Sequence, residues 1–188
     1  YHKGLLYLNE LINRRKISSN AVKARRELLE GMLQNEAKED LGIKGYGPEM
    51  SIYKSLLTAT GIHRQVNGKW QFTDPDPNSG ISDVWDEIEH FLVHATDKAK
   101  PLSELIEILK AVPFGVKEGP LPILFTAVLL KHSDDFGLYY KDKYLPSIDP
   151  EHLDFLTRFP ERFTIKYFKI EGIQADFFKA IEGVFESS

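Results

Sequence analysis

Residues 123–130 read Ile-Leu-Phe-Thr-Ala-Val-Leu-Leu, so every residue of the segment except Thr126 is apolar. Pro122 precedes the segment, and the polar pair Lys131-His132 follows it. A helix that is apolar on all sides has no face for solvent and has to be buried by its neighbours. We therefore expect this segment to form a helix that the rest of the protein surrounds.

An alternating pattern follows the apolar segment. Short alternating arms on either side of residues 141–143 predict a β-hairpin. Asp149 as an N-cap with Pro150 behind it predicts a short helix, and residues 163–168 predict a third strand. Helix, hairpin, helix and strand in this order are typical of a winged-helix-like unit.

The N-terminal part of the chain repeats the order of helices followed by a hairpin. Apolar residues at helical spacing predict one helix at residues 5–12, and Ser18-Ser19-Asn20 supply cap residues for a second amphipathic helix. Pro48 suits the first position of a third helix. The Asn67-Gly68 pair between short extended arms is a strong signal for a hairpin turn.

A proline-rich linker at residues 74–80 is the best boundary candidate. We predict an N-terminal helical, winged-helix-like unit at residues 1–75 and a second winged-helix-like unit at residues 81–170. The second unit opens with helices between residues 81 and 112, because apolar residues recur there with a period of about 3.6. An amphipathic helix at residues 171–188 is expected to continue into a longer parent chain. The predicted fold class is α+β, mainly α-helical with small antiparallel β-hairpins and two winged-helix-like units in tandem.

Composition narrows the setting of the protein. The 188 residues include no cysteine, which excludes disulfides and thiolate chemistry and fits a reducing compartment, so we expect a cytoplasmic protein. The longest apolar run is shorter than the roughly 18 to 20 residues of a membrane span, so we expect no membrane partner.

Charge is distributed unevenly along the chain. The formal net charge is -4, which disfavours a general nucleic-acid coat, but the basic excess lies in the first thirty residues. A surface for phosphate contacts is predicted there, extended by the first hairpin with His63. The candidate nucleic-acid-binding residues are Arg14, Arg15, Lys16, Lys23, Arg25, Arg26, Arg64 and Lys69. The alternative is a solvated helix face on which these side chains pair with Glu27 and Glu30. In the second unit, the helix that would read DNA is too apolar to enter a groove, so that unit is interpreted as structural.

Catalytic and metal-binding patterns do not emerge. Asp86, His90 and His94 share one helix face, but the pattern lacks the glutamate of a zinc-protease helix and reads more simply as a solvated polar face. Asp135-Phe136-Gly137 spells a kinase triplet without the other kinase motifs. We therefore predict no catalytic residue, no metal site and no cofactor, and expect that this chain is not an enzyme.

Four segments together resemble part of very large bacterial P-loop ATPases encoded in phage-defence loci, including BREX-type systems. These segments are residues 18–26, residues 45–64, the pairs Val84-Trp85 and Phe91-Leu92, and residues 113–163. The nucleotide-binding motifs of such ATPases lie elsewhere in the polypeptide, so no catalytic residue carries over. The resemblance implies an auxiliary winged-helix-like region that engages DNA or partner subunits.

The leading functional hypothesis is a non-catalytic module of a larger ATPase that mediates protein–protein or nucleic-acid contacts in phage defence. Its partners would be the rest of the ATPase chain, partner subunits, or DNA. The alternative is a stand-alone winged-helix DNA-binding regulator, which needs an exposed basic recognition surface. Measuring the binding of a labelled DNA duplex at rising salt separates these two hypotheses.

Overall fold

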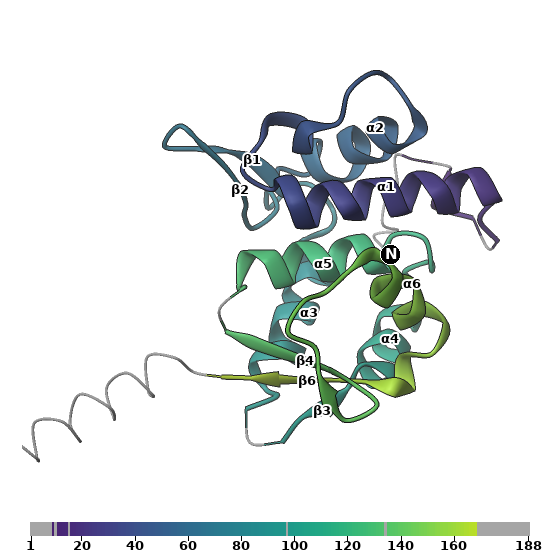
Figure 1. The fold of residues 1–188 in the computed structure, drawn as a ribbon, viewed down its shortest axis with the longest axis vertical. Helices are drawn as coiled ribbons and strands as arrows, with labels where there is room; N and C mark the ends of the chain where they lie inside the picture. Colours follow the sequence, from purple (N-terminus) through teal and green to yellow (C-terminus); the bar gives the residue numbers. More distant parts are fainter. Residues whose placement is uncertain (1–8, 10, 15, 97, 134, 169–188) are drawn as a thin grey trace, which may run out of the picture.

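The computed structural model describes residues 9, 11–14, 16–96, 98–133 and 135–168. Its elements form two groups that lie one above the other, with α5 next to α1 where the groups meet (Figure 1). The first group contains α1 (Ser19–Asn35), the 3-10 turn η1 (Glu39–Gly42), α2 (Pro48–Ile52), its continuation η2 (Tyr53–Thr58), β1 (His63–Val66) and β2 (Lys69–Phe72). The second contains α3 (Ser82–Val93), β3 (Lys100–Pro101), α4 (Leu102–Lys110), α5 (Leu121–Lys131), β4 (Phe136–Tyr140), β5 (Lys143–Tyr144), α6 (Pro150–Arg158), the 3-10 turn η3 (Pro160–Arg162) and β6 (Phe163–Tyr167). Helices combined with small antiparallel sheets confirm the predicted α+β class.

Local signals set the ends of the elements in the first group. The Ser18 side chain accepts a hydrogen bond from the Ala21 N–H at 3.2 Å and caps α1, as predicted. Pro48 occupies the first turn of α2, also as predicted. The β1–β2 turn has positive φ at both central residues, 51° at Asn67 and 81° at Gly68, which is the geometry that the Asn-Gly pair favours.

Helix α5 is enclosed by its neighbours, as the apolar segment predicts. All nine residues from Leu121 to Leu129 are buried. Helices α1, α3 and α6 and strand β2 contact α5. The helix therefore contributes hydrophobic burial on every side.

The predicted hairpin and third strand form a sheet with one strand that the sequence did not reveal. The strand order is β3-β6-β4-β5, and all neighbouring strands are antiparallel. Strand β3 has only two residues and includes Pro101, so it carries no alternating pattern. Helices α3 and α4 pack against β6 and cover one face of the sheet, where Phe163 and Ile165 are 0% exposed.

One hydrophobic core runs through both groups of elements, from Ile12 to Ile165. The linker at residues 74–80 is held against the second group, because the Trp85 indole donates a hydrogen bond to the Asp74 carboxylate at 3.0 Å. The two predicted units therefore share a core.

Two predicted helices fall mainly on residues that the structure does not describe. The helix predicted at residues 5–12 is described only at Asn9, Leu11 and Ile12, where residues 11–12 form a turn. The helix predicted at residues 171–188 lies outside the described residues.

Candidate nucleic-acid interface

The basic residues near the start of α1 form the first part of the predicted phosphate-contact surface. Arg14, Lys16, Lys23 and Arg26 are exposed, and the first turn of α1 contains no acidic residue. Lys23 lies 3.7 Å from the Glu27 carboxylate, so it pairs within its own helix, as the alternative interpretation proposed. Arg15 lies outside the described residues.

Arg25 occupies a different environment from its neighbours and is a correction to the predicted surface. The residue is 5% exposed, and its guanidinium donates to the Asp154 carboxylate of α6 at 2.8 Å. A second, longer hydrogen bond of 3.4 Å reaches the Glu118 carbonyl. Arg25 lies on the buried stripe of α1, one helical turn from Ala21 and Leu28, and therefore joins α1 to α6 instead of facing solvent.

The first hairpin contributes fewer cations than the sequence suggested. Arg64 donates to the Asp76 carboxylate at 2.8 Å, and Lys69 is exposed. His63 is 1% exposed and belongs to the core, which corrects its inclusion in the surface.

The buried His63 ring has a defined hydrogen-bonding role. Its Nε2 lies 2.7 Å from the Glu36 carbonyl, which can only accept, so Nε2 carries the proton. Its Nδ1 lies 2.8 Å from the Tyr53 hydroxyl. In this tautomer Nδ1 carries no proton, so it accepts a hydrogen bond from the Tyr53 O–H. Burial lowers the pKa of His63, and the bond to Glu36 only partly opposes this effect. The imidazole is a neutral structural group.

The structure divides the predicted residues between the two ends of α1. Residues 14–26 lie at its N-terminal end, whereas the hairpin lies near its C-terminal end, where His63 contacts the carbonyl of the C-cap residue Glu36 (Figure 1). The 17 residues of α1 span about 25 Å at a rise of 1.5 Å per residue. Any single ligand that touched both groups would therefore have to follow the length of the helix.

A cluster of polar side chains lies where the linker meets α3 and α5. The Lys131 ammonium donates to Asp74 and, at 2.6 Å, to Glu89, while His132 lies 2.8 Å from the same Glu89 carboxylate. Burial raises the pKa of Asp74, but the hydrogen bond and charge of Lys131 outweigh it and hold that pKa below its ordinary value. Burial likewise lowers the pKa of Lys131, but its two carboxylate partners outweigh this effect and raise the pKa. The pairs hold the linker, so the cluster has a structural use.

The histidines of α3 do not assemble a metal centre. The His94 Nδ1 lies 2.7 Å from the His90 carbonyl, and the two rings are 4.1 Å apart. Over the described ranges, no group of three His, Cys, Asp or Glu residues is arranged to hold a metal ion.

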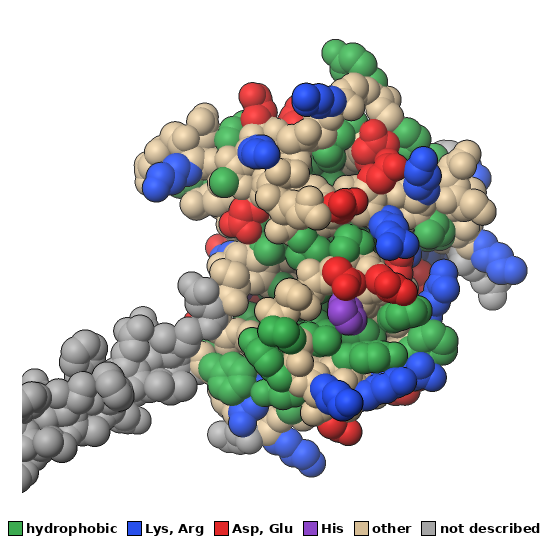
Figure 2. Space-filling model, in the orientation of Figure 1, with side chains coloured by type: hydrophobic (Ala, Val, Ile, Leu, Met, Phe, Trp, Pro, Cys, Tyr) green, Lys and Arg blue, Asp and Glu red, His purple; other side chains and the backbone are tan. Residues whose placement is uncertain are grey.

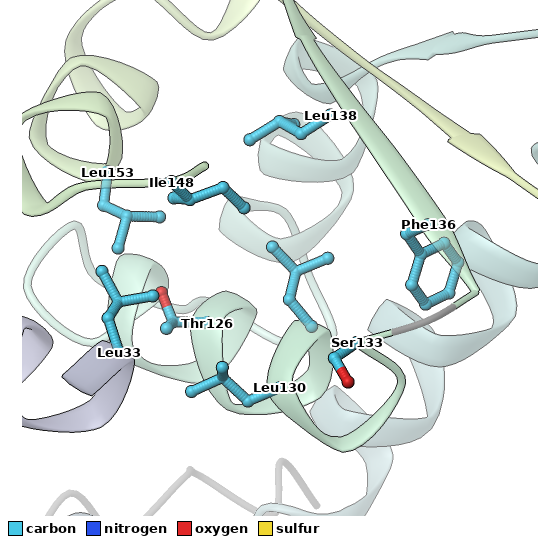
Figure 3. Close-up of a pocket in the computed structure, with 9 residues that line it drawn as sticks. Leu33, Thr126, Leu130, Ser133, Phe136, Leu138, Ile148 and Leu153 are labelled. Atoms are coloured by element: carbon cyan, nitrogen blue, oxygen red, sulfur yellow. The ribbon is translucent and has the colours of Figure 1, made fainter. Parts of the chain in front are cut away.

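A cavity of about 110 Å³ opens between α1, α5, α6 and β4 (Figure 3). Its lining residues are almost all apolar: Leu33, Thr126, Leu129, Leu130, Ser133, Phe136, Leu138, Ile148 and Leu153. The hydroxyl of Thr126 is already engaged, because it donates to the Pro122 carbonyl at 2.6 Å. The cavity can accept an apolar group and offers no titratable side chain for chemistry.

The face of the four-stranded sheet that α3 and α4 leave uncovered was not predicted as a site. Tyr139 and Tyr144 are directly paired across β4 and β5, and Thr164 and Lys166 lie beside them on β6. Alternation places these side chains on the face opposite the buried Leu138 and Ile165. Strand β4 reads Phe-Gly-Leu-Tyr-Tyr, a pattern that does not by itself reveal this face, and only the register shows that Tyr139 and Tyr144 are adjacent.

Comparisons with known proteins add no identification. In the part of the chain that the structure describes, no helix is long and apolar enough to cross a membrane. No protein-family model, curated protein or solved structure matches the chain.

Proposed function

We propose that this chain is a non-catalytic, winged-helix-like module of a larger P-loop ATPase that makes protein–protein or nucleic-acid contacts for the parent protein. Duplex DNA is the partner that the first unit suits best, and the contact surface is the N-terminal end of α1. The observation that carries the proposal is the exposure of Arg14, Lys16 and Arg26 at one end of a helix that is fixed to a continuous core.

The order of elements supports a winged-helix-like interpretation. Residues 82–144 run helix, strand, helix, helix and hairpin, and residues 19–72 run helix, helix and hairpin. In winged-helix proteins the helix before the hairpin enters the major groove of DNA. Helix α5 holds that position in the second unit, and its buried surface suits a scaffold instead of a reader. The DNA-contacting role is therefore assigned to the first unit, where it falls to the exposed cations near the start of α1 and not to α2 and η2, which precede the hairpin.

The environment of the basic residues supports phosphate contact over base readout. Flexible, exposed cations bind backbone phosphates and position a protein without reading sequence. The net charge of -4 means that binding would depend on this local group of cations and would be weak and sensitive to salt. Such contact suits a module whose parent ATPase supplies further interactions. A stand-alone regulator, the alternative, would need base-specific contacts as well.

Fluorescence anisotropy of a labelled duplex tests the proposal. We expect binding that falls steeply as salt rises from about 50 to 200 mM, with each removed phosphate contact reducing the slope of log K against log salt by about 0.9. The test variant is Lys16→Ala/Arg26→Ala, and a second variant replaces Arg14, Arg15 and Lys16 with alanine. Both should weaken binding without altering the circular dichroism spectrum.

The matched control is Lys110→Ala/Lys117→Ala, which removes the same charge as the first test variant from exposed positions on and after α4. Equal loss in the control and the test variants would show that only net charge matters, and would contradict the proposed surface. No binding of duplex at low salt would exclude DNA contact and leave protein–protein contact as the function.

A further inference from the structure

The face of the four-stranded sheet opposite α3 and α4 has the composition of a stacking platform. Tyr144 is 57% exposed, and its ring centroid lies 5.7 Å from that of Tyr139 in an edge-to-face arrangement. Thr164 lies opposite Tyr139, and Pro101 lies opposite Thr164, so a row of side chains crosses all four strands. With strands about 4.8 Å apart, this row is about 14 Å long.

Glycine keeps part of this face flat. Gly137 is paired with Lys166, and a Cβ atom at Gly137 would lie 2.6 Å from a ring carbon of Phe168. The Phe168 ring therefore rests on the glycine backbone beside Tyr139. The ammonium of Lys166 is 5.7 Å from the centre of that ring.

Basic residues lie on either side of this row, displaced from it along the direction of the strands. Arg162 and Lys141 meet at the end of the strands next to the hairpin turn, where the Lys141 N–H donates to the Arg162 carbonyl at 2.8 Å. Lys166 lies toward the other end of β6, about 13 Å from Arg162 at 3.3 Å per residue. Figure 2 shows lysine and arginine side chains along the lower margin of the molecule, beside hydrophobic ones.

Positive charge exceeds negative charge around the edges of the sheet, but only part of it reaches this face. Lys166 lies on the face, whereas the ammonium groups of Lys100 and Lys141 lie over the rings of Phe91 and Tyr140 on the opposite side of the sheet. The nearby described acids are Asp142 in the turn, Asp135, whose carbonyl accepts from the Phe168 N–H, and Glu161, whose carboxylate is 3.8 Å from Arg162. An anionic ligand complements Lys166, and the exposed ring of Tyr144 requires that this ligand also present flat apolar groups.

We propose that this sheet face binds single-stranded DNA, with bases stacked on Tyr144 and Tyr139 and a phosphate held by Lys166. Base stacking on aromatic side chains in a positively charged groove is the general mode of single-strand binding, and an open four-stranded sheet accommodates two or three bases. The face offers aromatic rings, the Lys166 ammonium and the hydroxyls of Tyr139, Tyr144 and Thr164, and DNA is chosen as the ligand because the proposed function is contact with DNA. The proposal rests on nucleic-acid contact as the task of the module, but uses a surface separate from α1.

Anisotropy of fluorescein-labelled oligothymidylate of about 16 nucleotides, the upper end of known site sizes, tests the proposal. We expect Tyr144→Ala to weaken binding by about 5- to 140-fold, which is the range for the loss of one stacked base. Tyr144→Phe retains the ring and should bind nearly as well as the unmodified chain. Lys166→Ala should reduce the salt slope by about 0.7, the value for one phosphate of a single strand.

The matched control is Tyr46→Ala, because Tyr46 is 101% exposed on the loop before α2, away from the sheet. The proposal is overturned if Tyr144→Ala binds like the unmodified chain, if Tyr46→Ala weakens binding equally, or if oligothymidylate does not bind at low salt. Tighter, Tyr144-dependent binding of oligouridylate would assign the face to RNA and would also overturn it. Lys16→Ala/Arg26→Ala should bind oligothymidylate as well as the unmodified chain does. The duplex assay therefore tests the surface on α1, the oligothymidylate assay tests the sheet face, and failure of one proposal can be distinguished from failure of the other.

Discussion

Removing the Asp154 carboxylate should destabilise the protein more than any surface ion-pair mutation. Asp154 is the ion partner of Arg25, and their side chains are only 14% and 6% exposed. Deleting one member of a buried pair leaves the other charge desolvated and costs about 3–5 kcal/mol. The remaining 3.4 Å contact from Arg25 to the Glu118 carbonyl offsets little of this loss. Alanine is a better helix former than aspartate, so Asp154→Ala introduces no loss of helix propensity in α6.

Urea unfolding followed by circular dichroism measures the loss in the free energy of unfolding. In thermal unfolding of a chain of this size, a loss of 3–5 kcal/mol corresponds to a decrease in Tm of about 6–20 °C. The control Glu27→Ala breaks the exposed Lys23–Glu27 pair and should cost about 0.3–0.5 kcal/mol. Arg25→Met/Asp154→Leu removes both charges and should recover most of the stability, because the attraction within a buried ion pair is largely offset by the cost of desolvating both charges. A loss below about 1 kcal/mol in Asp154→Ala, or a double variant as unstable as the single one, would refute this reasoning.

Three further substitutions test the hydrophobic core, the turn between β1 and β2, and the buried histidine. Leu124→Ala in α5, where Leu124 is 0% exposed, should lower the free energy of unfolding by about 2–5 kcal/mol in the same urea assay, and a smaller loss would show that α5 is loosely packed. Gly68→Ala places a side chain at φ 81° and should cost about 1 kcal/mol, whereas Gly68→Asn should cost less. The pKa of His63 is lowered in the folded state, so its stabilising contribution is complete above the unfolded value of 6.5 and is lost as pH falls below that value. His63→Gln should therefore be less stable than the unmodified chain at neutral pH, but should lose less stability on acidification. An unchanged pH dependence of stability in this variant would contradict the neutral buried ring.

Elements with strong local signals were predictable from the sequence. The apolar run predicted α5 because a helix with no polar side can only be internal, and the structure buries every residue from Leu121 to Leu129. Ser18, Pro48, Asp149 and Asn67-Gly68 each act through backbone geometry within a few residues, so their roles did not depend on the rest of the fold.

Features that depend on distant partners were not predictable. Strand β3 exists only because β6 pairs with it, and two residues carry no periodicity. The widening of the helix at Tyr53–Thr58 into a π-helix has no sequence signal that we identify. Arg25 was assigned to the surface by its charge, although its place on the apolar stripe indicated burial; its partner Asp154 is 129 residues away. The adjacency of Tyr139 and Tyr144 likewise follows from register.

The two proposed nucleic-acid surfaces belong to one folded body, and this has a measurable consequence. Arg25 and Asp154 join α1 to α6, and α6 leads through η3 directly into β6, which carries part of the sheet face. Two sites that are held at a fixed separation bind a ligand spanning both of them more tightly than either site alone, whereas independent sites gain less.

A duplex with a single-stranded thymidine tail should therefore bind more tightly than either the duplex or oligothymidylate, provided that the tail reaches the sheet. In Asp154→Ala, measured below its unfolding temperature, the gain from linking the two parts should shrink while the binding of each separate part changes little. A tailed duplex that binds no better than its stronger part would show that the surfaces do not act together. An undiminished gain in Asp154→Ala would show that the shared core alone fixes their separation, and that the Arg25–Asp154 pair contributes to stability only.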